Sequence, residues 1–231
     1  MSIFDERLLP VINDRLFVFD MDGTLLIQTT ACLELAKAAG TVDQLQNLER
    51  QFSAGELDAF GFAKQIGSLW GVMEEETVRA VFAATPKLDN IRTVTEIIRK
   101  GGGHSGVITM SPDFYAHLFY DYGFDFIGAS QFPRSPGEAI LRERILNPED
   151  KAAIVRQWCS RLGLKMSRCV AFGDSMSDYL LFRELEHTVS VNGDPTLRTL
   201  ARYHYEGADL YDAFVGVCSR MLHAGEDLHN E

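Results

Sequence analysis

The chain has 231 residues, of which 46% are hydrophobic and 24% charged, as in a soluble globular protein with one large domain or a core domain plus an insertion. Its formal net charge of −11, from 22 basic and 33 acidic side chains, argues against nucleic acid as a partner. No segment approaches the ~20 apolar residues that span a bilayer, and the N-terminal segment lacks a signal-peptide core, so we expect no membrane partner and a cytoplasmic location.

The four cysteines, Cys32, Cys159, Cys169 and Cys218, form no Cys-x-x-Cys pair. This spacing is typical of free thiols in a reducing compartment, and not of a disulfide framework or a zinc site. Nothing in the sequence assigns an oligomeric state.

The first predicted strand, residues 16–20, ends on acidic side chains. A run of apolar residues leads to Asp20 and Asp22, which are followed by Gly23 and Thr24. An isolated Asp-Gly pair after a strand is usually a turn with solvated carboxylates. Here the acidic string follows a buried strand and matching residues recur downstream, so we interpret Asp20 and Asp22 as a metal-assisted catalytic pair.

Four predicted helices follow, at residues 28–39, 42–53, 56–70 and 74–84. The stretch that they occupy is about sixty residues long, more than a crossover between parallel strands requires. We therefore predict that residues 28–86 form a small helical cap domain over the carboxyl end of the first strand, and that residues 1–27 and 87–231 form the core domain. The cap residues that we consider for substrate contact are Gln28, Thr29, Lys64 and Trp70.

Helices and strands alternate along the rest of the chain. The predicted elements are a helix at 88–100, a strand at 106–110, a helix at 112–122, a strand at 124–129, a loop or hairpin at 130–146, a helix at 148–162, a strand at 168–172, a helix from 179, a strand at 188–191 and a final helix from about 195. This order predicts an α/β fold: a doubly wound, mainly parallel Rossmann-like sheet with an inserted α-helical cap domain.

Two short segments in this region contain residues that mark the ends of helices. Three glycines at 101–103 follow a helix and precede a strand, which is typical of a helix C-cap and turn, and not of a phosphate-binding loop. Ser111 and Pro112 are predicted to be the N-cap and the first residue of the helix at 112–122.

Polar residues recur where predicted strands end: Asp20, Asp22, Ser111, Asp174 and Asp178. Ligands of such sheets bind beyond the carboxyl ends of the strands, so we expect these residues to meet. Converging carboxylates need a cation, and oxygen ligands beside a phosphate favour Mg²⁺. One carboxylate can then act as a nucleophile and another as a general acid and base, while a lysine and a hydroxyl hold the phosphate.

The string Phe19-Asp20-Met21-Asp22-Gly23-Thr24-Leu25 resembles the first motif of the haloacid dehalogenase-like (HAD) phosphatase superfamily. Ser111 is similar to its second motif, Lys151 to its third, and residues 173–178 to its fourth. The helical insertion resembles the C1 cap of the phosphoserine-phosphatase-like branch. Lys151 would lie in the first turn of a helix, where the dipole disfavours a cation, and local conflicts of this kind tend to mark functional positions.

The resemblance implies catalytic and phosphate-binding roles for five residues. Asp20 would be the nucleophile, Asp22 the general acid and base, and Lys151 would steady the nucleophile and the transferring phosphoryl group. Thr24 and Ser111 would contact the phosphate. The implied reaction is Mg²⁺-dependent hydrolysis of a small-molecule phosphate monoester through an aspartyl-phosphate.

The resemblance also implies a set of metal ligands. Asp20, the backbone carbonyl of Asp22 and the side chain of Asp174 would bind Mg²⁺, and Asp178 would support the ion. The implied partner is the small phosphate ester itself.

This sequence differs from the phosphoserine phosphatases at positions that would contact the substrate. Those enzymes have a glutamate at the position of Thr29, and alignment puts Ile66 at the position of their cap arginine. They follow the serine of the second motif with two glycines, where this chain has Pro112, which has no amide hydrogen, and Asp113, which adds a negative charge. With Thr29 and Asp113 near the substrate, we predict a phosphate ester other than phosphoserine, for example a sugar, polyol or amino-alcohol phosphate.

Three alternatives belong to other functional classes or reactions. A phosphomutase of the same superfamily would share the core and a helical cap. A GDSL-type serine esterase would use Ser175 as its nucleophile, but no downstream Asp-x-x-His supplies the base, and the nearest pattern is Glu-Asp-Leu-His in the tail segment 226–229. A non-catalytic binding module would keep the fold without the chemistry, and the intact set of motif residues argues against it.

Overall fold

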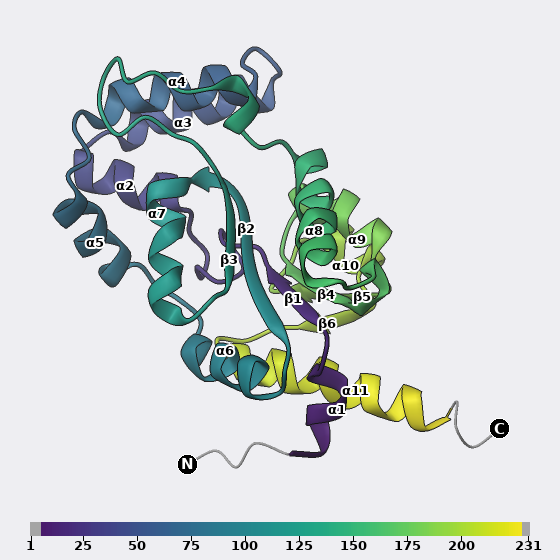
Figure 1. The fold of residues 1–231 in the computed structure, drawn as a ribbon. Coiled ribbons are helices and arrows are strands. Elements are labelled where there is room, and N and C mark those ends of the chain that lie inside the picture. The colour runs from purple at the N-terminus through teal and green to yellow at the C-terminus, as the bar shows by residue number, and fades with distance from the viewer. Residues whose placement is uncertain (1–5, 228–231) are drawn as a thin grey trace.

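The computed structural model describes residues 6–227, and within this range six parallel strands form one sheet (Figure 1). They are β1 (Leu16–Phe19), β2 (His104–Pro112), β3 (Phe126–Ser130), β4 (Cys169–Gly173), β5 (His187–Val191) and β6 (Tyr203–Tyr205). Their spatial order is β3-β2-β1-β4-β5-β6. This order, with β1 in the middle, confirms the predicted doubly wound, parallel, Rossmann-like sheet.

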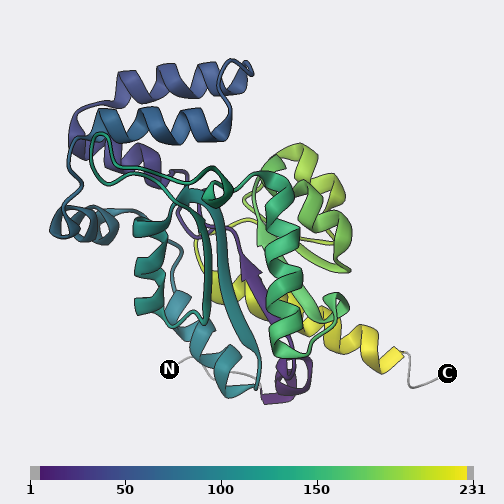
Figure 2. The same ribbon diagram turned by 45° about the horizontal axis from the view of Figure 1, so that its top comes forward.

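Four helices lie between β1 and β2: α2 (Ala31–Ala39), α3 (Val42–Ser53), α4 (Ala59–Trp70) and α5 (Glu75–Ala84). α2 begins after Thr30 and α4 after Asp58, because the side chains of these two residues accept hydrogen bonds from the first-turn N–H groups of Leu33 and Gly61. Figures 1 and 2 show α3 and α4 stacked side by side beyond the end of the sheet. An α-helical insertion after the first strand is therefore present, as predicted.

The other helices are α1 (Leu9–Ile12), α6 (Ile91–Lys100), α7 (Asp113–Ala116), α8 (Pro148–Leu162), α9 (Tyr179–Glu184), α10 (Pro195–Leu200) and α11 (Leu210–Asp227). Short 3-10 helices occur at Glu6–Leu8, His117–Tyr122, Arg142–Arg144, Met166–Arg168 and Met176–Asp178. None of the helices between residues 6 and 227 has both the length and the apolar character needed to cross a bilayer.

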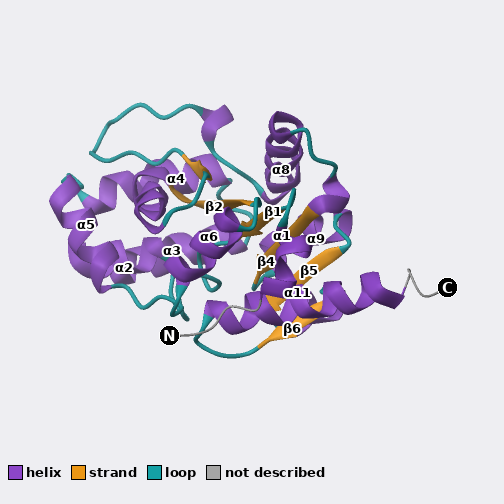
Figure 3. Ribbon diagram, turned by 60° about the horizontal axis from the view of Figure 1, so that its bottom comes forward, coloured by secondary structure: helices purple, strands orange, loops and turns teal. Residues whose placement is uncertain are grey.

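Helices cover both faces of the sheet, and the alternation of side chains along β1 shows why. Phe17 and Phe19 point into a core shared with α6, α11 and the helical insertion. Leu16 and Val18 point into a second core with α8, α9 and α10. Figure 3 shows α11 on one side of the strands and α8 on the other. A strand buried on both faces needs an apolar residue at every position, which explains the unbroken run in the sequence.

The glycine run at 101–103 ends a helix, as predicted. The Gly101 N–H donates to the carbonyl of Ile97, and Gly102 has a φ of +77°. The triple glycine is thus a turn between α6 and β2.

The prediction that Ser111 is an N-cap is wrong. β2 continues through Pro112, and the helix begins at Asp113. The strand continues because a register shift after Ile108 lets Pro112 pair with Ser130 of β3. Ser111 therefore lies on a strand, with its side chain at the end of the sheet where β1 also ends.

The helix predicted from about 195 begins there, but the prediction that it is the final element is wrong. α10 ends at Leu200, and the next residues form β6, which pairs with β5. The Thr188 hydroxyl of β5 accepts the N–H of Arg202, which turns the chain back toward the sheet. α11 then begins at Leu210, and the Asp209 carboxylate accepts the N–H of Tyr211 in its first turn.

The segment between β3 and α8, residues 131–147, reaches out to α4 and is called the β3–α8 loop below (Figure 1). Pro133 of this loop packs so closely on α4 that a Cβ at Gly67 would lie 2.0 Å from its ring. Arg142 of the loop bonds to Asp58 at 2.5 Å and lies over the ring of Phe60. The loop and the helical insertion are therefore in contact near the end of the sheet.

Candidate active site

The polar centre of the molecule lies at the carboxyl ends of β1 and β4, where Lys151 is enclosed by acidic side chains. Its ammonium group donates to Asp20 Oδ1 at 2.6 Å, to Asp178 Oδ1 at 2.7 Å and to the Ser177 hydroxyl at 3.0 Å. Lys151 is completely buried, and the two aspartates are also buried. The two carboxylates outweigh the unfavourable dipole that a cation meets in the first turn of α8, and they hold the ammonium beside Asp20.

Backbone groups position the acidic side chains around this lysine. Asp20 follows β1, and its N–H donates to the carbonyl of Phe172 on β4 at 2.8 Å, which continues the strand pairing. Asp178 Oδ2 accepts from the N–H of Asp174 at 3.2 Å and of Ser175 at 3.5 Å, as part of a capping box. These bonds leave Asp178 Oδ1 facing the lysine.

Gly23 allows the turn after β1 to approach Asp174. Its φ is +76°, and a Cβ at this position would lie 2.2 Å from Asp174 Oδ2, so only glycine fits. Thr24, predicted to contact phosphate, is completely buried, and its hydroxyl is 3.5 Å from Asp174 Oδ1. In this structure Thr24 supports a carboxylate of the site and does not reach the pocket described below.

Asp20, Asp174 and Asp178 each offer a carboxylate oxygen within 4.8 Å of the others. Burial and, to a smaller extent, the negative charge of Asp178 raise the pKa of Asp174 to about 7. Burial likewise raises the pKa of Asp20, although the charge of Lys151 opposes this. One lysine does not balance three acidic groups, so this oxygen donor set suits a hard divalent cation such as Mg²⁺. We call Asp20, Asp174, Asp178 and Lys151 the carboxylate cluster.

Asp22 faces α2 and β2. Its Oδ1 accepts from the N–H of Ala31 at 2.7 Å, and its Oδ2 accepts from the hydroxyls of Ser111 and, at 3.5 Å, of Thr109. Ala31 is the first residue of α2, whose dipole stabilises a negative charge here. Burial nevertheless raises the pKa of Asp22, and the Ser111 bond is the main opposing influence. A carboxyl group in this environment can hold a proton and pass it on.

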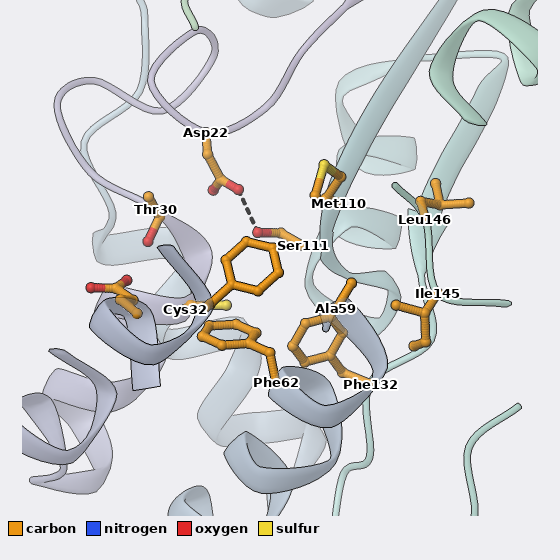
Figure 4. A pocket seen from close by; sticks show the side chains of 12 residues that line it. Asp22, Thr30, Cys32, Ala59, Phe62, Met110, Ser111, Phe132, Ile145 and Leu146 are labelled. Atoms are coloured by element: carbon orange, nitrogen blue, oxygen red, sulfur yellow. Dashed lines mark hydrogen bonds between the residues drawn. The ribbon is translucent and has the colours of Figure 1, made fainter. Parts of the chain in front are cut away.

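A pocket of about 210 Å³, which we call the aromatic pocket, opens at Asp22 and Ser111 (Figure 4). It is lined by Asp22, Thr30, Cys32, Glu49, Phe52, Ala59, Phe62, Met110, Ser111, Phe132, Ile145 and Leu146. In Figure 4 the rings of Phe62 and Phe132 lie below the Asp22–Ser111 hydrogen bond. The lining is mainly apolar, and among the described residues no lysine, arginine or histidine contributes to it.

Two residues predicted to bind substrate lie elsewhere. Thr29 is buried and donates its hydroxyl to Glu34 Oε1 at 2.5 Å, so its neighbour Thr30 lines the aromatic pocket instead. Asp113 lies in a separate depression with Arg134, and its Oδ1 accepts from the N–H that follows it. Both side chains are turned away because their polar atoms already have local partners.

The other candidates from the helical insertion also lie outside the aromatic pocket as it is lined within residues 6–227. Gln28 is exposed, Lys64 lines a depression between α4 and the β3–α8 loop, and Trp70 packs against Phe114 and Phe132. Ile66, aligned with the cap arginine of the phosphoserine phosphatases, is buried among apolar side chains.

The residues that sequence reasoning missed are the walls of this pocket. Glu49 and Phe52 lie on α3, Phe62 on α4, and Phe132 and Ile145 on the β3–α8 loop. The i, i+3 spacing of Glu49 and Phe52 on α3, and of Ala59 and Phe62 on α4, puts the two members of each pair on one face of their helix. The positions of the other lining residues depend on the path of the β3–α8 loop and on how α3 and α4 pack in the folded protein.

The geometry does not favour the esterase alternative. Ser175 caps the 3-10 helix Met176–Asp178, and its hydroxyl lies 3.2 Å from that of Ser177. Within residues 6–227, no hydrogen bond joins Ser175 to a histidine. His229, from the tail segment considered above, lies outside the described residues.

Comparison with known proteins finds relatives in sequence. The model of the family described as haloacid dehalogenase-like hydrolase matches residues 17–183. A phosphoserine phosphatase of Archaeoglobus fulgidus is 23% identical over 208 residues, which cover 89% of this chain and 59% of the relative. One from Mycobacterium tuberculosis is 27% identical over 193 residues, which cover 81% of this chain and 46% of the relative. The chain thus spans about half the length of these two proteins.

Comparison with solved structures finds the same fold. A structure described as a phospho-aspartyl intermediate analogue of phosphoserine phosphatase has a TM-score of 0.69 at 18% sequence identity. The match covers 87% of this chain and 98% of that chain. At this identity the likeness concerns the arrangement of helices and strands.

Proposed function

Because this chain belongs to the haloacid dehalogenase-like hydrolase family, we propose that it hydrolyses a small phosphate monoester with Mg²⁺, through a phosphorylated Asp20. The observation that carries this proposal is the buried ion pair between Lys151 and Asp20, within a group of three carboxylates. The matched relatives named as phosphoserine phosphatases support a phosphomonoester as the substrate.

In the first step a carboxylate oxygen of Asp20 attacks the phosphorus atom, and the bond from phosphorus to the ester oxygen breaks. Lys151 holds Asp20 Oδ1, which orients the carboxylate and leaves its second oxygen for the attack. The same ammonium stabilises the negative charge that builds up on the phosphoryl oxygens. Ser111, which lines the pocket, would contact one of these oxygens.

Asp22 supplies the proton that the leaving alcohol needs. Its raised pKa, caused by burial, lets it carry this proton before the first step. In the second step water attacks the phosphorus atom, Asp22 takes a proton from that water, and the bond from phosphorus to Asp20 breaks. Inorganic phosphate leaves, and both aspartates return to their starting states.

The carboxylates of Asp20 and Asp174, with the backbone carbonyl of Asp22, would hold Mg²⁺, and Asp178 would support the ion. When bound, Mg²⁺ neutralises the phosphate and the excess charge of the carboxylates. Gly23 keeps Asp174 close to the turn after β1, so the ligands come together without rearrangement of the backbone.

We further propose that residues 28–86 act as a cap that selects the alcohol, and that the substrate is not phosphoserine. A serine carboxylate in the aromatic pocket would find no cationic side chain among the described lining residues, and it would meet the negative charge of Glu49. The buried Ile66 supplies no charge either.

A screen of small phosphate esters for phosphate release in the presence of Mg²⁺ tests this proposal. The wild-type protein should release phosphate from at least one ester, and Asp20→Asn should release none. Asp43→Asn, at an exposed position of α3, is the control and should match the wild type. Mass spectrometry of acid-quenched protein should find one added phosphoryl group in the wild type and none in Asp20→Asn.

Two outcomes would contradict separate parts of the proposal. Full activity of Asp20→Asn would exclude the covalent mechanism, while faster turnover of phosphoserine than of every other ester would overturn the substrate assignment. A phosphomutase would instead move the phosphate within its substrate and release little of it.

A further inference from the structure

Glu49 places a negative charge without a partner in the wall of the aromatic pocket. It lies on α3, and within residues 6–227 its carboxylate has neither an ion pair nor a hydrogen bond from a side chain. The Glu49 side chain is exposed to solvent, and the burial that it retains beside the pocket raises its pKa. A ligand that brings a positive charge to this wall would be attracted by the carboxylate, whereas a neutral ligand would not.

The other walls present aromatic ring faces. The rings of Phe52 and Phe62 lie 5.4 Å apart at an angle of 44°, so they form a corner and not a flat surface. Phe132 reaches the pocket from the β3–α8 loop, where stacking on Trp70 at 6.2 Å holds its ring. Ring faces attract ammonium groups, and groups of aromatic rings are the usual protein site for quaternary ammonium ligands.

The two ends of the pocket differ in the chemistry that they offer. At one end lie the Ser111 hydroxyl and Asp22, which is two residues after Asp20 in the chain. Glu49 and Asp22 both line this pocket, whose volume is only about 210 Å³. A short molecule can therefore place a phosphate at Ser111 and its other end beside Glu49.

We propose that the alcohol released by this protein carries a cationic group, an amine or a quaternary ammonium, which binds between the aromatic rings and Glu49. This inference rests on the proposed function, since the phosphate end of the pocket sets the direction of the substrate. The reaction stays balanced: the phosphorus–oxygen bond breaks, the alcohol oxygen takes its proton from Asp22, and the ammonium group is unchanged.

A matched pair of substrates isolates the charge. Phosphocholine and 3,3-dimethylbutyl phosphate have the same shape, but the first has a positive nitrogen where the second has a carbon. The kcat/KM of the wild-type protein with Mg²⁺ should be at least about tenfold higher for phosphocholine. Equal values for the pair would overturn the proposal, because the pocket would then accept any apolar group of that size.

Variants show whether Glu49 is responsible for this preference. Glu49→Gln should lower the ratio of the two kcat/KM values about fivefold or more, through the KM for phosphocholine. Asp43→Asn, which removes an exposed carboxylate from the same helix, should leave the ratio as in the wild type. If Glu49→Gln lowered kcat/KM by the same factor for both esters, the residue would only support the fold, which would contradict the proposal.

A binding measurement separates this inference from the proposed function. If the wild-type protein hydrolyses no ester, including para-nitrophenyl phosphate, the proposed function fails. Calorimetry with Asp20→Asn and the same two phosphates then still tests the pocket: tighter binding of phosphocholine supports the cationic site, and equal dissociation constants overturn it.

Discussion

The carboxylate cluster and the aromatic pocket meet at Asp22, but their residues are held in different ways. Cluster residues follow β1 and β4 or lie in the first turn of α8, and main-chain hydrogen bonds position several of them. Pocket residues come from α3, α4 and the β3–α8 loop, where side chains pack on side chains. A change in the cluster should therefore affect every substrate alike, whereas a change in the pocket should affect some substrates more than others.

The largest effect is expected for Lys151→Met. It leaves Asp20 and Asp178 buried without the cation that both contact, so activity on every phosphate ester should fall about a thousandfold. Removal of this buried cation should also lower the free energy of unfolding by about 3–5 kcal/mol in protein without Mg²⁺. Phosphate release and urea unfolding measure the two effects.

Lys165→Met, at an exposed position, is the control for this variant and should change neither quantity. The double variant Lys151→Met with Asp178→Asn should be more stable than Lys151→Met alone, because it removes one of the two uncompensated charges. If the loss of activity in Lys151→Met depended strongly on the alcohol of the ester, the cluster would also select substrates, which would contradict the proposed difference between cluster and pocket.

A smaller but still general effect is expected for Gly23→Ala. The new Cβ would clash with Asp174 at a positive φ, so activity on all esters should fall about a hundredfold and Mg²⁺ should bind more weakly. Gly40→Ala is the matched control, because its φ is +69° and no atom lies within 4 Å of its Cβ. It should cost about 1 kcal/mol of stability and leave the kinetics unchanged, and equal kinetic losses in both variants would contradict the steric argument.

The same difference between the two regions explains what could be predicted from the sequence. The strand that ends at Asp20 could be recognised because burial on both faces demands an unbroken apolar run, and its acidic end is unusual. The parallel order then carries Asp174 to the same end of the sheet from more than 150 residues away. Local patterns are enough when a regular sheet does the positioning.

The pocket walls have no such local pattern. Phe132 lies on the long β3–α8 loop without periodicity, and Glu49 looks like any charged residue on the polar face of a helix. The strand β6 was missed because three residues at a sheet edge give no alternation to detect. Ser111 was misplaced because Ser-Pro resembles a helix start, while the pairing of Pro112 with β3 depends on tertiary structure.

Binding of Mg²⁺ tests the cluster through stability, without any substrate. At a concentration of about 100 times its dissociation constant, the ion should stabilise the fold by about 2.7 kcal/mol, which raises Tm by about 5–10 °C for a chain of this size. Asp174→Asn should lose most of this shift, because it removes one of the three clustered carboxylates, while Asp43→Asn should keep it. Differential scanning calorimetry with and without EDTA measures the shift, and an unchanged Tm in the wild type would exclude a magnesium site here.

The smallest effect is expected at the contact between the β3–α8 loop and α4. Arg142 bonds to Asp58 and covers the ring of Phe60, but both charged side chains are more than half exposed, so solvent screens most of their attraction. Arg142→Ala should therefore leave kcat unchanged and raise KM about twofold, because the loop also carries Phe132 and Ile145 into the pocket. Arg156→Ala breaks a comparably exposed ion pair with Glu184, between α8 and α9, and should leave KM as it is. Since the loop contributes to the pocket and not to the cluster, a fall in kcat with Arg142→Ala would mean that the two regions are mechanically linked.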